Sequence, residues 1–160
     1  MKALSLTQPW ATLVAIGAKK IETRSWWTQY RGTLAIHAAK NFPKDCREVA
    51  CIEKFWEPII DLIGRGKFPW MTGNAYPMGA IVATCELVEI SGPLSLATSW
   101  HGCTEHWKNK HCFRLTENER AFGDYSEGRY IWLLENVKLL PEPIPAKGML
   151  GLWEWDENGL

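Results

Sequence analysis

The segment Met1–Trp27, MKALSLTQPWATLVAIGAKKIETRSWW, places a short apolar helix directly before a charged strand. Pro9 suits the first turn of a helix, because the N–H that proline lacks has no partner there. Apolar residues then recur at helical spacing as far as Gly17, and glycine favours the left-handed conformation in which helices often end. From residue 20 to 24, charged and uncharged residues alternate, which predicts a strand with its charges on one face.

Three charged residues in this segment form the first candidate site. Lys19, Glu22 and Arg24 place a carboxylate between two cations. As a ladder of surface ion pairs they would contribute little to stability. As a pocket, the two cations could hold phosphate or carbonyl oxygens while the carboxylate accepts hydrogen bonds from the edge of a base.

The length and composition predict an ordinary folded domain. The chain has 160 residues, of which 46% are hydrophobic, so it can bury a core without disulfides or a structural metal. Its 18 basic and 18 acidic residues give a net charge of zero. This balance argues against a strong, sequence-blind binder of phosphate backbones, but it is compatible with a local basic groove.

The sequence also indicates the compartment. Gln-Pro interrupts the N-terminal apolar stretch, so no secretory signal is expected. The longest apolar run, Ala11–Ala18, is too short to cross a bilayer. The five cysteines form no regular disulfide framework, which favours reduced thiols. We therefore expect a cytoplasmic protein without a membrane partner or a cofactor.

The rest of the chain predicts an α+β fold. Further strands are expected at residues 33–39, 80–90, 130–140 and 151–155, with PEPIP (141–145) as a stiff crossing between the last two. Residues 43–64 show a helical pattern that Pro58 is expected to interrupt, whereas 91–124 is polar and irregular. Short strands with long loops favour a small closed barrel. We predict one domain over 1–160 with a helical insert at about 41–76.

Aromatic and polar residues elsewhere can join the pocket. Trp26 has the parity of Glu22 and Arg24 along the strand, so its ring is expected on their face, where it can stack on a base. Packing of this ring on the arginine stem is the structural alternative. The further candidates for the binding site are Gln8, Trp10, Gly17, His37, Lys40, Arg129 and Lys147.

A second cluster of reactive residues lies in WHGCTEHWKNKHC (100–112). It holds five potential zinc ligands, namely His101, Cys103, His106, His111 and Cys112. Their spacing matches neither a zinc knuckle nor half of a zinc finger. We therefore interpret the segment as a polar loop and predict no metal site.

The opening segment resembles the ASCH (activating signal cointegrator homology) family. The hallmark of that family, G-x-K-x-x-E-x-R after a short helix, is matched by Gly17, Lys19, Glu22 and Arg24. Later segments that resemble the family are RGTLAIHAAK, GAIVATCELVEI, FGDYSEGRYIWLLENV and KGMLGLWEW. The resemblance implies a small β-barrel similar to the PUA fold, with a cleft beside the helix that binds RNA or a nucleotide-like ligand.

The resemblance also allows a hydrolase, because some members of the family are hydrolases. In the amidohydrolases that deacetylate N4-acetylcytidine, the motif lysine corresponds to Lys19, but their threonine corresponds to Glu22. Thr23 is expected on the opposite face of the strand, and a carboxylate cannot replace a reacting hydroxyl without a change of mechanism. Binding is therefore the first hypothesis. A hydrolase that uses Lys19 and Glu22, either an amidohydrolase or a metal-independent ribonuclease, is the second, and a protein-interaction module is the third.

Overall fold

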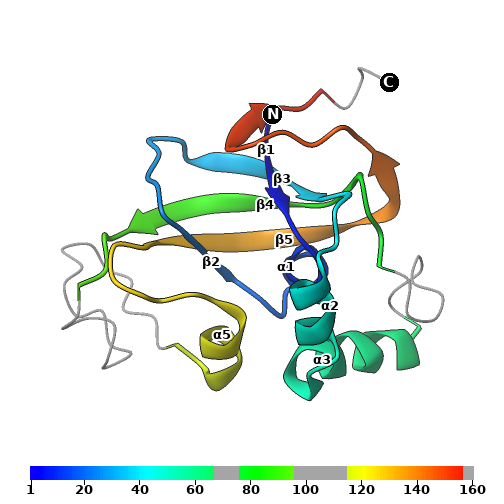
Figure 1. Cartoon of the computed structure of the whole chain (residues 1–160). Coiled ribbons are helices and arrows are strands. Elements are labelled where there is room, and N and C mark those ends of the chain that lie inside the picture. The colour runs from blue at the N-terminus through cyan, green and yellow to red at the C-terminus, as the bar shows by residue number, and fades with distance from the viewer. Residues whose placement is uncertain (67–75, 96–114, 157–160) are drawn as a thin grey trace.

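The computed structural model describes residues 1–66, 76–95 and 115–156 (Figure 1). One six-stranded sheet contains β1 (Lys2–Leu6), β2 (Ile21–Arg24), β3 (Gly32–Ala38), β4 (Ala80–Ser91), β5 (Tyr130–Pro145) and β6 (Leu152–Glu154). The helices within these ranges are α1 (Trp10–Ala15), α2 (Lys44–Ala50), α3 (Glu53–Gly64) and α5 (Glu117–Phe122). The predicted α+β class is confirmed, while the predicted single domain and the limits of its helical insert stay predictions.

The sheet is a curled half-barrel. Its strands follow the order β2-β5-β4-β3-β1-β6, in which β1 and β3 are parallel and the other neighbours are antiparallel. The curl brings β2, at one edge, close to β1 near the other edge, where the Arg24 side chain reaches the Ser5 main chain. Among the described residues no strand pairing joins β2 to β1 or β6. The predicted barrel is therefore a half-barrel, and the Arg24 side chain, not strand hydrogen bonding, links β2 to β1.

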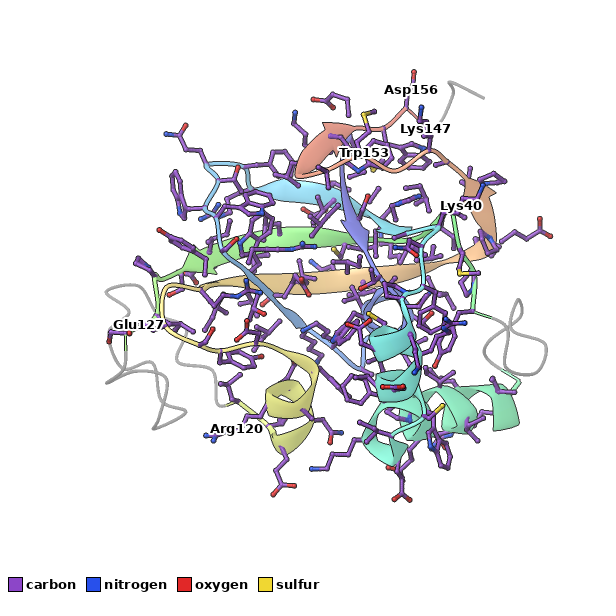
Figure 2. The ribbon with its side chains drawn as sticks, in the orientation of Figure 1. Lys40, Arg120, Glu127, Lys147, Trp153 and Asp156 are labelled. Atoms are coloured by element: carbon purple, nitrogen blue, oxygen red, sulfur yellow. The ribbon has the colours of Figure 1, made fainter. Side chains whose placement is uncertain are left out.

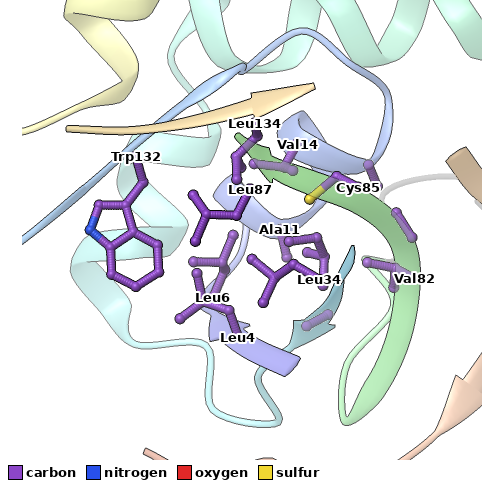
Figure 3. Packing of buried hydrophobic residues seen from close by; sticks show 14 of the residues in the cluster. Leu4, Leu6, Ala11, Val14, Leu34, Val82, Cys85, Leu87, Trp132 and Leu134 are labelled. Carbon is purple, nitrogen blue, oxygen red and sulfur yellow. The ribbon is translucent and has the colours of Figure 1, made fainter. Parts of the chain in front are cut away.

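Helix α1 lies inside the curl and organises the core (Figure 3). Ala11 and Val14 face the sheet, where the buried residues around them include Leu4, Leu6, Leu34, Val82, Leu87, Trp132 and Leu134. On another side of α1, Leu13 packs against Phe55, Ile59 and Phe122 of α3 and α5. Because α1 is buried between the sheet and these helices, its end at Gly17 fixes where β2 begins.

The predicted break at Pro58 is wrong. Pro58 lies inside α3, and the helical region is interrupted earlier, at Ile52, whose backbone is extended (φ −75°, ψ 132°). A proline in a helix interior removes one main-chain hydrogen bond. The buried side chains of Phe55 and Ile59 lie on either side of it in sequence, and their packing against α1 outweighs that loss.

The predicted crossing at PEPIP is also wrong, because β5 continues to Pro145. Ala146 N donates to Gly79 O (2.9 Å), so the nitrogen of Pro145 points away from β4. On that other side no described strand pairs with β5 at this point, since β2 pairs only with Tyr130–Leu133. The β4–β5 register also shifts between Leu139 and Ile144, and such irregularities tolerate proline.

Gly17 provides a test of how the first helix ends. Its φ is +75°, as the sequence predicted, and a Cβ placed there would have no atom within 4 Å. Gly17→Ala should therefore lower the free energy of unfolding by about 1 kcal/mol through backbone strain alone.

The matched control is Gly64→Ala at the end of α3, where the added Cβ also has open space but φ is not positive. This variant should leave stability unchanged or raise it by up to about 1 kcal/mol. Urea unfolding measures both. Equal effects of the two substitutions would contradict the strained turn at Gly17.

Candidate functional site

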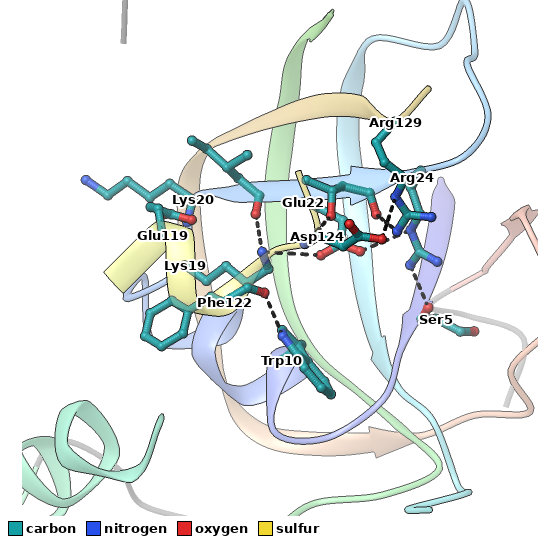
Figure 4. A network of polar contacts seen from close by, with 12 residues as sticks. Ser5, Trp10, Lys19, Lys20, Glu22, Arg24, Glu119, Phe122, Asp124 and Arg129 are labelled. Atoms are coloured by element: carbon teal, nitrogen blue, oxygen red, sulfur yellow. Dashed lines mark hydrogen bonds and ion pairs between the residues drawn. The ribbon is translucent and has the colours of Figure 1, made fainter. Parts of the chain in front are cut away.

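A buried chain of charges begins where α1 turns into β2 (Figure 4). Glu22 lies between two cations, with Lys19 Nζ 3.6 Å from Oε2 and Arg24 Nε 3.1 Å from Oε1. Lys19 is 1% exposed and also donates to the main-chain oxygen of Ile21. Buried charges are tolerated only when they are paired and hydrogen-bonded. The structure therefore brings together the three charges that the sequence singled out.

Arg24 extends this series of charges to β1, near the other edge of the sheet. Its Nη2 donates to the main-chain oxygen of Ser5 (3.1 Å). Met1 O, on the same edge of β1 as Ser5 O by strand alternation, accepts from Trp155 N near β6. Because β6 pairs with β1 only as far as Leu4, the guanidinium takes the position that a longer β6 would occupy.

A second arginine lies near β2. Arg129 Nε is 3.3 Å from Asp124 Oδ2, and its Nη2 donates to Thr23 O (3.3 Å). Hydrogen bonds from Ser126, together with the charge of Arg129, lower the pKa of Asp124, so this carboxylate is ionised. Each arginine is thus held by one carboxylate and one main-chain oxygen.

These residues line an open hollow of about 450 Å³, which is within the usual range for small-ligand sites. The residues around it include Ser5, Thr7, Trp10, Glu22, Thr23, Arg24, Phe122, Asp124 and Arg129. Trp10 forms part of the wall, where its Nε1 donates to Phe122 O (2.7 Å). The hollow presents guanidinium donors beside carboxylate acceptors, an arrangement that suits a ligand with both kinds of group.

Helix α5 supports this hollow and was not predicted. Thr116 Oγ1 accepts from Glu119 N (3.1 Å), which begins the helix. The T-x-x-E spacing is a known helix-start signature and would have revealed it. The Glu119 carboxylate accepts from Lys20 N (2.5 Å), so α5 docks directly on the start of β2. Burial raises the pKa of Glu119, although the Lys20 N–H and the Lys19 charge act in the opposite direction.

Thr23 also lines the hollow. The prediction that its side chain lies on the strand face opposite Glu22 stays a prediction. Thr23 Oγ1 accepts from Asp124 N (3.2 Å), because the chain after α5 wraps around this edge strand. Asp124 itself was missed, since nothing in the local sequence relates it to the opening motif.

Several of the predicted site residues do not line this hollow, and among them are Gly17, Lys19, Gln8 and Trp26. Lys19 lies behind Glu22. Gln8 is fully buried, where its Nε2 donates to Pro77 O (2.7 Å) and its Oε1 accepts from Thr12 N (3.1 Å). Trp26 packs edge-on against Trp132, with ring centroids 4.7 Å apart. Because β2 ends at Arg24, strand parity no longer applies at Trp26.

His37 and Lys147 belong to a second hollow. His37 Nε2 contacts Ala146 O and Nδ1 contacts Ser5 Oγ, both at 3.1 Å, and burial lowers the pKa of the imidazole. The Ser5 hydroxyl also contacts Met149 O (3.0 Å) and accepts from Trp153 Nε1 (3.2 Å). Because Nε2 of the neutral imidazole must donate to the Ala146 carbonyl, Nδ1 carries no hydrogen, and the single Ser5 hydroxyl hydrogen can be directed either to Met149 O or to Nδ1. Ser5 thus links β1, His37 and the segment around Met149.

The histidine- and cysteine-rich cluster at 101–112 lies outside the described residues. Within the described ranges, no three His, Cys, Asp or Glu side chains gather as metal ligands. In the same ranges, no helix has the length and apolarity needed to cross a membrane.

Comparison with known proteins gives a family match. The sequence model of the ASCH domain matches residues 4–143. Activating signal cointegrator 1 of Homo sapiens is 28% identical over 161 aligned positions, and that of Mus musculus is 26% identical. Each match covers 97% of this chain but 22% of the relative, so the chain spans about a fifth of the length of these curated relatives.

Solved structures are also similar. One of them is a crystal structure of a mutant of the ZmASCH protein from Zymomonas mobilis, with 17% identity and a TM-score of 0.45. The similarity covers 90% of this chain and 74% of that chain.

Glu119 gives a prediction with a defined pH dependence. Its pKa is raised on folding, so the folded state gains from the bound proton below about pH 4.5 and loses that gain as pH rises through the folded pKa. Glu119→Gln keeps an oxygen for Lys20 N but cannot ionise. Its free energy of unfolding, relative to the original protein, should therefore rise between pH 4 and pH 7.

Glu117→Gln is the control, because Glu117 lies on the same helix with its side chain 90% exposed. Its free energy of unfolding, relative to that of the original protein, should change little between pH 4 and pH 7 in urea unfolding measurements. If the free energy of unfolding of Glu119→Gln, relative to that of the original protein, stayed constant or fell as the pH rose, burial would not disfavour the ionised carboxylate.

Proposed function

Because the chain belongs to the ASCH domain family, a family associated with nucleic acids, we propose that the first hollow binds one nucleotide of an RNA strand. In this proposal Arg24 and Arg129 donate to phosphate or carbonyl oxygens. Glu22 and Asp124 accept hydrogen bonds from the edge of the base. The residues that line the hollow around these four side chains enclose a space of suitable size for such a ligand.

The observation that carries the proposal is the fixed position of the two arginines. Each guanidinium faces a carboxylate with its Nε and donates one Nη to a main-chain oxygen. A guanidinium has further N–H donors, and both side chains remain about a quarter exposed at the hollow. A ligand would therefore meet donors that are already oriented, which reduces the entropy lost on binding.

The carboxylates favour a base over a bare phosphate. Glu22 and Asp124 lie within the same hollow as the arginines, where they would repel a phosphate placed close to them. The amino and imino groups of a base can instead donate to these oxygens. Such pairing of donors and acceptors reads the edge of an unpaired base, which is the form in which RNA is usually recognised by sequence.

The position of Lys19 favours binding over hydrolysis. A hydrolase of the kind that the family resemblance suggests would need this ammonium at the reacting group. Here Lys19 is buried behind Glu22, and it does not line the hollow. Thr23 is among the lining residues, and its hydroxyl accepts from Asp124 N. Hydrolysis therefore stays the alternative, to be decided by experiment.

The test is binding of a fluorescently labelled single-stranded RNA, followed by anisotropy. Arg129→Ala should weaken binding by about tenfold or more, because it removes hydrogen bonds from a charged donor. Arg129 is a better target than Arg24, which also joins two strands. Arg65→Ala is the control, since it removes the same charge from an exposed position outside the hollow.

Arg65→Ala should change the affinity by less than about twofold. Equal affinities of the two variants, with both shown to be folded by circular dichroism, would reject the hollow as the RNA site. Turnover of N4-acetylcytidine by the original protein, measured by chromatography, would replace the binding proposal with the hydrolase alternative.

A further inference from the structure

A second hollow, of about 830 Å³, lies near the ends of β3 and β5. Its walls include the cations Lys40 and Lys147 and the apolar side chains of Met78, Met149 and Leu150. Figure 2 labels the two lysines on the same side of the molecule. The motif at the start of the chain does not reach this hollow, so the proposed function leaves it unexplained.

The charge of the second hollow is not balanced. Neither Lys40 nor Lys147 forms an ion pair within the described part of the chain, and no carboxylate is among the lining residues. In the first hollow, by contrast, each arginine faces a carboxylate. The second hollow is therefore suited to an anion.

Its rim is unusually apolar for a surface. Met149 and Leu150 are 55% and 99% exposed, and Met78 is 49% exposed. Exposed apolar groups gathered at a concave site mark a binding surface more often than isolated ones do. Methionine is flexible and can pack against flat rings of different shapes.

The wall that carries these groups is fixed in place. A Cβ on Gly148 would lie 2.2 Å from His37 Cε1 and 2.9 Å from Ser5 Oγ, so the chain here packs directly on both side chains. Hydrogen bonds to the main-chain oxygens of Ala146 and Met149 secure the segment on either side of Gly148. Lys147 and Met149 therefore project from a firmly held backbone.

The two hollows meet at Ser5, which lines both. Its main-chain oxygen accepts from Arg24 at the first hollow, while its hydroxyl contacts His37 at the second. A ligand that extends beyond one nucleotide can thus pass over the end of β1 from one hollow to the other.

We propose that the second hollow binds the next part of the RNA strand whose first nucleotide lies between Arg24 and Arg129. This inference rests on the proposed function of the first hollow. Lys40 and Lys147 contact phosphates of the strand, and Met149 and Leu150 pack against a neighbouring base. Charge complementarity and the shared residue Ser5 favour this occupant over a protein or a small anion.

The test measures how RNA binding depends on salt. For single strands, log K falls with log [salt] with a slope of about −0.7 per phosphate contact. The double variant Lys40→Ala/Lys147→Ala should therefore reduce the slope for an oligonucleotide by about 1.4 in magnitude. It should leave the affinity for cytidine unchanged, because that uncharged probe has no phosphate for the second hollow and fills the first hollow only.

The control is Lys54→Ala/Lys138→Ala, which removes the same charge from exposed positions that line neither of these hollows. It should keep the original slope. If Arg129→Ala weakens both probes but the two double variants share one slope, the second hollow is not part of the RNA site and the first proposal stands. If neither probe binds the original protein, the proposed function fails and this inference fails with it.

Discussion

The hydrogen bond from the Arg24 guanidinium to the Ser5 main-chain oxygen joins edge strand β2 to β1, near the opposite edge of a sheet in which no described strand pairing closes the gap. Strand β2 pairs with β5 alone, so its other edge has no strand beside it among the described residues. Glu22 holds Arg24 in place, and Lys19 balances the charge of Glu22 from the buried side. The curl of the sheet and the shape of the first hollow therefore depend on the same charges.

This dependence explains why the site is rigid and nearly neutral. Glu22 is paired with a cation at each carboxylate oxygen, and removal of either cation would leave one of these oxygens without its charged partner. Arg129 and Asp124 repeat the arrangement on the other side of Thr23. The outcome is a hollow in which donors and acceptors are set before a ligand arrives, beside a second hollow whose cations form no ion pair with the described residues. The first suits a base, and the second suits the backbone that follows it.

The part of this arrangement that depends on near neighbours was predictable from sequence. The turn at Gly17 and the grouping of Lys19, Glu22 and Arg24 follow from local spacing, and both are present. The wrong or missing predictions depend on distant contacts. Pro58 was tolerated because α3 packs on α1, and Asp124 reaches the hollow because the chain after α5 wraps around β2. Glu119 illustrates an intermediate case, since a local signature marks its helix but not its contact with Lys20.

The central claim is that Arg24 and Arg129 are held in place before any ligand binds and then engage the ligand directly. Nuclear magnetic resonance of the arginine Nε–H groups tests it. The free protein should show two separate Nε–H signals that exchange slowly with water, and both should shift when single-stranded RNA is added. Signals that are averaged and exchange rapidly in the free protein, or that stay unchanged when RNA binds, would contradict this account.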